Sequence, residues 1–389
     1  MKKYISFLLA LCTLGACSQY DLFETGDGIY SDRASDNGNG YGQDETPSGV
    51  LTAAEWNDLV NWPYWCSLMR SSEYRDHCSY WGYSTDNRLA LRITDEKGEA
   101  VAGARVQLTL GDWTWDARTD NRGYANCWAG LFTDTKADVL TGAELTVEGV
   151  KYEGDLQFTH HQDEELKVNE ITVTGAATPQ QCVDVAFIVD ATGSMSDEID
   201  FLKSDLVDIL DRASEYAREM TIRSAALFYR DEGDDYVTKH QDFTTDPKET
   251  ADYVSKQRAS GGGDYPEAVH TALEDALQKL SWNLNARSRV AFLILDAPAH
   301  YTDEILESMK RSVRGFAKCG IAIIPVAASG ADYDTEFLLR TFAIATGGTF
   351  TFLTDDSGVG EEHLKPTVGQ YEVEKLNDLI TRLIQERME

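Results

Sequence analysis

Positive charge is scarce in this sequence: 35 lysines and arginines face 66 aspartates and glutamates, which leaves a net charge of −31. Such a surface repels phosphate backbones, which argues against a nucleic acid partner and favours divalent cations. Beyond the N-terminal segment no uninterrupted apolar run reaches about 18 residues, so we expect no membrane-spanning helix. The sequence has no Cys-x-x-Cys pair, so zinc or thioredoxin-type chemistry is not indicated.

Residues 1–16 have the pattern of a secretory signal. Lys2 and Lys3 precede a short apolar stretch, and the segment ends in Leu-Gly-Ala followed by Cys17. This ending resembles a bacterial lipobox, in which the cysteine is acylated and becomes the new N-terminus. The resemblance implies a lipid-anchored protein of the cell envelope, at the outer membrane of a Gram-negative bacterium, on its periplasmic or surface face. An ordinary signal with a small-residue cleavage site is the alternative.

Five cysteines remain beyond the signal and Cys17, so at least one thiol is unpaired or pairs between chains. An exported location permits disulfides. Cys66 and Cys78 are the best candidates for a disulfide, because they lie close together in one aromatic-rich segment.

Two segments at the start of the chain differ in composition from the domains that follow. Residues 17–50 are rich in glycine and acids without any period, which predicts a flexible acidic tether. Residues 51–84 are rich in tryptophan and tyrosine. We interpret them as an aromatic cluster that packs against the next domain, with a stacking platform for sugar as the alternative.

Residues 85–176 alternate apolar and polar positions in short runs separated by turn signals, which predicts an all-β sandwich. The segments TDEKGEAVAGARVQLTL and ARTDNRGYA resemble the carboxypeptidase-regulatory-like, transthyretin-like sandwich family. The resemblance implies a spacer or binding accessory without catalysis.

Residues 178–389 alternate buried-strand runs with amphipathic helical patterns, such as strands at 183–189 and 290–295. This alternation predicts an α/β fold with a doubly wound, mostly parallel sheet covered on both faces. Helices are expected at 266–280 and 373–386, and Thr302 is expected to cap another.

Oxygen-bearing side chains follow three of the predicted strands, where open α/β sheets bind ligands. Asp190 ends the first strand, with Thr192 and Ser194 two and four residues on. A glycine-rich loop contains Asp264, and Asp296 follows another buried strand. Carboxylates and hydroxyls suit a hard cation such as Mg²⁺.

These loops resemble the metal-ion-dependent adhesion site of the von Willebrand factor A-domain family. The resemblance covers residues 178–389 and implies that they form a Rossmann-like domain. Asp190, Thr192 and Ser194 match its Asp-x-Ser-x-Ser element, with threonine replacing the first serine, and Asp296 matches its third-loop aspartate. The second-loop threonine has no clear counterpart, and Asp264 is the candidate for its place. The Gly-Gly-Gly-Asp-x-Pro-Glu form looks like the branch that includes many bacterial members and the domain found beside α-kinases.

Each of these residues has a simpler interpretation. Ser194 or Ser196 could cap the helix after the first strand, Asp264 could cap the helix at Pro266, and Asp296 could be an ordinary loop acid. The acidic residues 231–235 read as a solvated hairpin, or as a flank that concentrates cations near the loops.

We therefore expect a binding protein rather than an enzyme. The resemblance implies Mg²⁺ (or Mn²⁺) and a protein partner whose Asp or Glu completes the coordination, with a role in adhesion or assembly. The alternatives are a scaffold without a working metal site and a metal-dependent hydrolase, for which His300 is the nearest base.

Overall fold

The computed structural model describes residues 51–132, 137–163, 165–357 and 363–389, all within one compact unit. The predicted signal, Cys17 and the tether at 17–50 lie outside these residues. Within them, no helix combines the length and the apolar character needed to cross a membrane.

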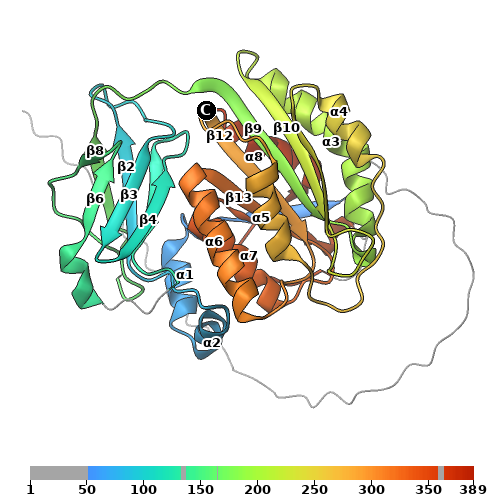
Figure 1. The fold of residues 1–389 in the computed structure, drawn as a ribbon, viewed down its shortest axis with the longest axis horizontal. Helices are drawn as coiled ribbons and strands as arrows, with labels where there is room; N and C mark the ends of the chain where they lie inside the picture. The colour runs from blue at the N-terminus through green and yellow to red at the C-terminus, as the bar shows by residue number, and fades with distance from the viewer. Residues whose placement is uncertain (1–50, 133–136, 164, 358–362) are drawn as a thin grey trace, which may run out of the picture. The chain divides into compact units, whose positions relative to one another are not determined.

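An eight-stranded sheet ordered β11-β10-β9-β12-β13-β14-β1-β15 lies at the centre of the C-terminal part (Figure 1). Strands β10, β9, β12, β13 and β14 run parallel, and β11 is antiparallel to β10. This confirms the expected α/β fold with a large, mostly parallel sheet. The strands are β1 (Thr52–Trp56), β9 (Gln180–Asp190), β10 (Thr221–Tyr229), β11 (Thr238–Thr244), β12 (Ala286–Leu295), β13 (Ile321–Ala327), β14 (Phe350–Thr354) and β15 (Val373–Lys375).

Helices cover both faces of this sheet, because its central strands are apolar on both sides. One face packs on α3 (Ser196–Tyr216), α4 (Pro247–Val254) and α8 (Leu376–Glu386). The other packs on α5 (Val269–Lys279), α6 (Asp303–Cys319) and α7 (Tyr333–Thr346). Thr302 caps α6 by accepting a hydrogen bond from the Ile305 amide, as predicted.

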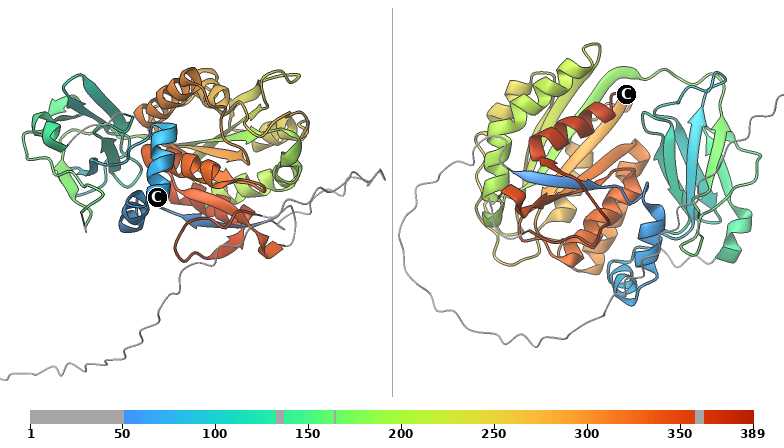
Figure 2. Two further views of the ribbon diagram at one scale, coloured as in Figure 1. Left: turned by 90° about the horizontal axis from the view of Figure 1, so that it is seen from below. Right: turned by 180° about the vertical axis from the view of Figure 1, so that it is seen from behind.

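Strand β1 comes from the segment that the sequence predicts to be an aromatic cluster. It lies antiparallel between β14 and β15, although 302 residues separate Thr52 from Thr354 (Figure 2). The large sheet therefore draws one strand from outside residues 178–389. Residues 373–375, predicted as the start of a helix, form β15 instead.

The rest of the aromatic segment forms α1 (Trp62–Met69) and α2 (Ser72–Trp81). Trp62, Trp65 and Trp81 are at most 2% exposed, which supports packing rather than an open sugar platform. The predicted disulfide is not formed. Cys66 is buried in α1, whereas the Cys78 thiol of α2 contacts the Met69 sulfur at 3.6 Å, and both cysteines are free.

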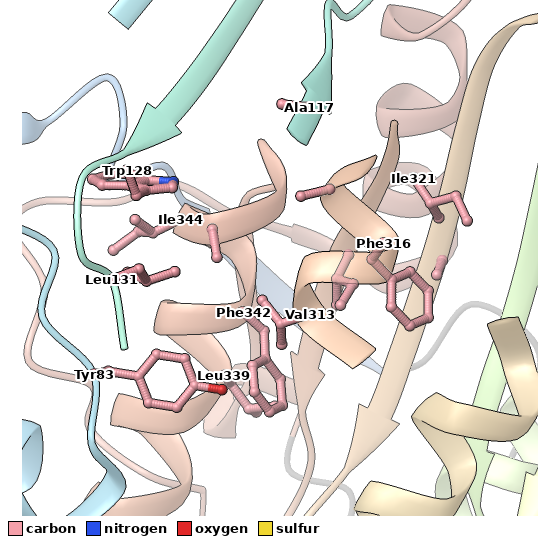
Figure 3. Packing of buried hydrophobic residues seen from close by; sticks show 14 of the residues in the cluster. Tyr83, Ala117, Trp128, Leu131, Val313, Phe316, Ile321, Leu339, Phe342 and Ile344 are labelled. Atoms are coloured by element: carbon pink, nitrogen blue, oxygen red, sulfur yellow. The ribbon is translucent and has the colours of Figure 1, made fainter. Parts of the chain in front are cut away.

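Residues 85–173 form a two-sheet β region, of which three strands are ordered β5-β2-β8 and four are ordered β4-β3-β6-β7. Its strands are β2 (Arg88–Thr94), β3 (Arg105–Leu110), β4 (Trp113–Arg118), β5 (Tyr124–Trp128), β6 (Glu144–Val147), β7 (Val150–Lys151) and β8 (Val168–Thr172). Trp128 and Leu131 pack in one buried cluster with Phe342 and Ile344 of α7 (Figure 3). The β region and the α/β part thus share a core.

Candidate metal centre

The first loop holds the carboxyl group of Asp190 in a fixed orientation. Its Oδ1 accepts hydrogen bonds from the Thr192 amide at 2.8 Å and from the Thr192 hydroxyl at 2.7 Å. Both side chains are at most 2% exposed. The Oδ2 atom is buried, and the hydroxyl group of the fully buried Tyr229 is a further donor beside this carboxyl group. A buried carboxylate with so few donors is costly, and a cation would stabilise it.

The glycine-rich second loop is hydrogen-bonded to the first. The Ser260 amide donates to Ala191 O at 3.0 Å, and the Gly193 amide donates to Gly261 O at 3.1 Å. Gly261 and Gly262 have φ values of 87° and 74°, which favour glycine. Asp234 accepts a hydrogen bond from the Gly262 amide at 3.0 Å. One member of the acidic run 231–235 therefore holds the second loop.

Glu267 is a site residue that sequence reasoning missed. Its side chain is 4% exposed, and its Oε2 has no hydrogen-bond partner among the described residues. A Cβ on Gly262 would lie 3.0 Å from Glu267 Oε1 and 3.2 Å from Thr192 Cβ. Glu267 is thus a second buried carboxylate beside the first loop. The Pro-Glu sequence suggested only the first turn of a helix.

The third loop brings Asp296 to the same edge. Asp296 is 6% exposed, and its carbonyl oxygen accepts a hydrogen bond from the Tyr265 hydroxyl at 3.2 Å. The Glu267 amide donates to Pro298 O at 2.9 Å, so the second and third loops are joined. The three loops form one connected unit at the carboxyl ends of β9 and β12.

The buried carboxyl groups disfavour one another's charge. Burial raises the pKa of Asp190 to about 7, and the charge of Asp296 adds to this rise. Burial raises the pKa of Glu267 to about 9, with further contributions from the charges of Asp190, Asp231 and Asp296. A divalent cation among them would reverse this repulsion. The donor set therefore fits a hard cation.

Asp264 lies in a neighbouring cluster. Asp231, Asp264 and His300 each offer a ligand atom, and these atoms lie within 4.8 Å of one another. His300 Nε2 contacts Asp231 Oδ1 at 2.7 Å. Two aspartates and a histidine form a candidate metal site whose ion is not established. Two members of the acidic run 231–235 therefore lie beside the loops: Asp234 bonds to the second loop, and Asp231 belongs to the cluster with Asp264.

The helix-cap interpretations fail. Helix α5 begins at Val269, and its N-cap, Ala268, makes no side-chain cap, so Asp264 caps no helix there. Ser194 is exposed, and α3 begins with Met195 as an N-cap that also makes no side-chain hydrogen bond. Neither Ser194 nor Asp264 has a capping role that would explain its presence.

A further carboxylate, Glu198, borders the site from the first turn of α3. Its Oε1 accepts hydrogen bonds from the Ser329 amide at 3.3 Å and from the Ser329 hydroxyl at 3.2 Å. Burial raises the pKa of Glu198 to about 7. The Ser329 hydroxyl also lies 3.0 Å from His363 Nε2, and His363 Nδ1 lies 2.8 Å from Asp355. This chain of contacts holds the loop after β13 against α3.

Comparison with known proteins supports the fold of the C-terminal part. Residues 184–324 match the von Willebrand factor A domain, so the chain contains such a domain. An α-protein kinase, vwkA, from Dictyostelium discoideum is 33% identical over 162 residues, which is 41% of this chain and 25% of the kinase. A putative ariadne-like RING finger protein, R811, from Acanthamoeba polyphaga mimivirus is 30% identical over 137 residues, which is 34% of this chain and 13% of that protein.

The chain spans a quarter or less of the length of these two relatives. Each of them therefore matches this chain over a part of its own length only. A kinase and a RING finger protein point to no common activity, so neither assigns catalysis to this chain.

Proposed function

We propose that the protein binds a partner protein through a divalent cation, Mg²⁺ or Mn²⁺, held by the three loops. Von Willebrand factor A domains typically mediate protein–protein interaction, and the domain found at residues 184–324 supports this class of function. The observation that carries the proposal is the set of buried carboxyl groups that the three loops bring together, Asp190, Glu267 and Asp296, whose charges disfavour one another. A cation among them relieves this repulsion, and an Asp or Glu of the partner completes its coordination.

The residues proposed to hold the ion are Asp190, Thr192, Ser194 and Asp296. Glu267 takes the place of the second-loop threonine that the family has and this sequence lacks. Asp264 contributes through its neighbouring cluster with Asp231 and His300. The bound ion supplies positive charge for the partner's carboxylate. The role of the protein is then adhesion or assembly at the cell envelope, to which Cys17 anchors the chain by lipid.

A titration calorimeter tests the metal site with purified full-length protein. We expect Asp190→Asn to abolish Mg²⁺ binding and Glu267→Gln to weaken it about tenfold or more, the size of effect seen even when an outer-shell partner is removed. Neither change should lower the melting temperature of the metal-free protein, because burial already disfavours the charged form of both carboxyl groups and the amide keeps the shape of the side chain. Asp211→Asn and Glu215→Gln, both exposed near the far end of α3, are the matched controls.

The partner is tested by capture from envelope extract with Mg²⁺ or with a chelator. A partner retained only with Mg²⁺, and lost with Asp190→Asn, supports the proposal. Absence of Mg²⁺ and Mn²⁺ binding by the wild type would leave a scaffold without a working metal site. Covalent labelling of Ser329 by a fluorophosphonate would instead favour a hydrolase, because Ser329, His363 and Asp355 contact one another in series.

A further inference from the structure

A cavity of about 490 Å³ lies between the β region and the α/β part. Its lining includes the start of β12, the end of α8 and the facing edges of β2 and β4. The start of β12 is the amino-terminal end of a parallel strand, so the cavity lies at the opposite edge of the sheet from the metal loops. Its volume falls in the range of small-molecule sites.

Arginine dominates the polar lining of this cavity, in a chain whose net charge is −31. Only three acidic residues, Glu55, Asp120 and Glu386, line it. The six arginines are Arg88, Arg118, Arg122, Arg287, Arg289 and Arg387. A local excess of guanidinium groups in a strongly acidic protein indicates attraction for an anion.

Neutral oxygens, rather than carboxylates, satisfy the most buried of these arginines. Arg289 is 2% exposed and donates to the carbonyl oxygens of Asn283, Ala286 and Gly320. Arg88 is 4% exposed and donates to the Asn126 side chain and to Leu59 O. No described carboxylate lies within ion-pair distance of Arg88, Arg118, Arg289 or Arg387.

Two donors at the cavity have no partner at all in the described part of the chain, the buried Nε atoms of Arg118 and Arg287. Burial lowers the pKa of Arg88 to about 9 and that of Arg289 to about 10, and it also lowers the pKa of Arg118 and Arg387. Each shift has desolvation as its largest cause, and neighbouring carboxylates, such as Asp184 for Arg289 and Asp120 for Arg387, offset it only in part. Negative charge is therefore missing from a site that is built to receive it.

We propose that this cavity binds a small organic anion that carries two or more carboxylate or phosphate groups. Arg88 and Arg118 come from the β region, and Arg289 and Arg387 come from the α/β part, so a ligand with at least two anionic groups can engage both. Guanidinium groups pair with either oxyanion in a bidentate manner. Leu91 and Leu383 also line the cavity and leave room for an apolar body between the charged groups.

The proposal is tested with full-length protein freed of divalent cations on a chelating resin, with no soluble chelator present, at constant ionic strength. Citrate and inorganic pyrophosphate are the two probes, and acetate is the monovalent control. We expect one probe or both to bind saturably and to raise the melting temperature, whereas acetate does not. The stronger of the two probes identifies the oxyanion, carboxylate or phosphate.

Variants place the binding in this cavity. We expect Arg289→Gln and Arg118→Gln each to weaken the active probe at least tenfold. Arg311→Gln, at an exposed position on α6, removes the same charge and should leave binding unchanged. Asp190→Asn should also leave it unchanged, which separates this site from the metal loops.

Arg118 is only partly buried, and its guanidinium group donates a hydrogen bond to Gly103 O at 3.2 Å, so Arg118→Gln gives up little and should keep its circular dichroism spectrum even if Arg289→Gln does not fold. Two results would overturn the proposal. One is that neither probe binds saturably to the wild type. The other is that a folded Arg118→Gln variant binds the active probe as tightly as Arg311→Gln does.

Discussion

Asp264 and Glu267 lie three residues apart on one loop, yet their surroundings differ. Asp264 is exposed and lies beside Asp231 and His300, whereas Glu267 is buried beside Thr192. In our proposal Glu267 holds the ion and Asp264 serves the neighbouring cluster. A negative ligand strengthens metal binding but reduces the charge that attracts a partner's carboxylate.

We therefore predict different effects of neutralising these two residues. Glu267→Gln should weaken Mg²⁺ binding about tenfold or more but increase partner binding per occupied site, because the ion keeps more of its charge. Asp264→Asn should weaken Mg²⁺ binding less and leave the melting temperature unchanged, since Asp264 caps no helix. Calorimetry and partner capture at saturating Mg²⁺ measure both. If Asp264→Asn abolished Mg²⁺ binding as completely as Asp190→Asn, Asp264 would be a ligand of the ion held by the three loops.

Position along the chain predicted most of the candidate site, because Asp190 and Asp296 end buried strands that are recognisable from their apolar runs. The contribution of Glu267 was not predictable in the same way. Its backbone amide bonds to Pro298 O, a contact between loops more than 30 residues apart, and this contact keeps Glu267 out of α5. Asp231 is likewise buried, at 8% exposed, and contacts His300, which its place in an acidic run did not predict.

At the scale of elements, a buried ion pair holds the segment after β1 against α7. Arg340 Nε and Nη2 donate to the two oxygens of Asp58 at 2.9 and 2.7 Å, and both side chains are at most 3% exposed. Arg340 also bonds to Glu336 at 2.7 Å. Removing the charge of Asp58 leaves the buried Arg340 with Glu336 as its remaining carboxylate partner, so its charge is less well compensated.

Asp58→Asn is therefore expected to lower the free energy of unfolding by about 3 kcal/mol, as measured by urea denaturation. The matched control is Glu148→Gln, which removes an exposed ion pair with Arg105 and should cost less than about 1 kcal/mol. Equal losses in the two variants would show that the Asp58 pair does not anchor β1.

Alternation of strands and helices was readable from sequence because each element carries its own apolar period. Strand β1 was not readable, since its five residues stand among tryptophans and their partners lie some 300 residues away. Strand β15 was taken for helix because it is only three residues long and runs directly into α8. Pairing at the sheet edge, rather than local propensity, decided both elements.

On the scale of the whole molecule, the β region and the α/β part share buried surface, with Leu131 and Ile344 in one cluster. Arg314 of α6 adds a hydrogen bond to Thr114 O at 2.6 Å and stacks 4.5 Å from the Trp113 ring.

We expect the two parts to unfold in a single calorimetric transition. Leu131→Asp places a charge without a partner in the shared core and should split this transition into two. Leu131→Met keeps the apolar contact and should preserve one transition. Two transitions in the wild type would mean that the shared core does not couple them.

The lipid anchor proposed at Cys17 would attach the whole protein to a membrane. Each buried methylene of an acyl chain contributes about 0.8 kcal/mol, so several chains on one cysteine hold a domain without any spanning helix. Cys17→Ser, expressed in a Gram-negative host, should therefore move the protein from the membrane fraction to the soluble fraction, or leave its signal uncleaved, with loss of radiolabelled palmitate. Cys12→Ser is the matched control, because Cys12 lies within the predicted signal and should affect neither readout. A Cys17→Ser protein that still fractionates with membranes and still carries the label would refute the lipid anchor, and it would leave the metal-dependent binding of the folded domain to be judged on its own.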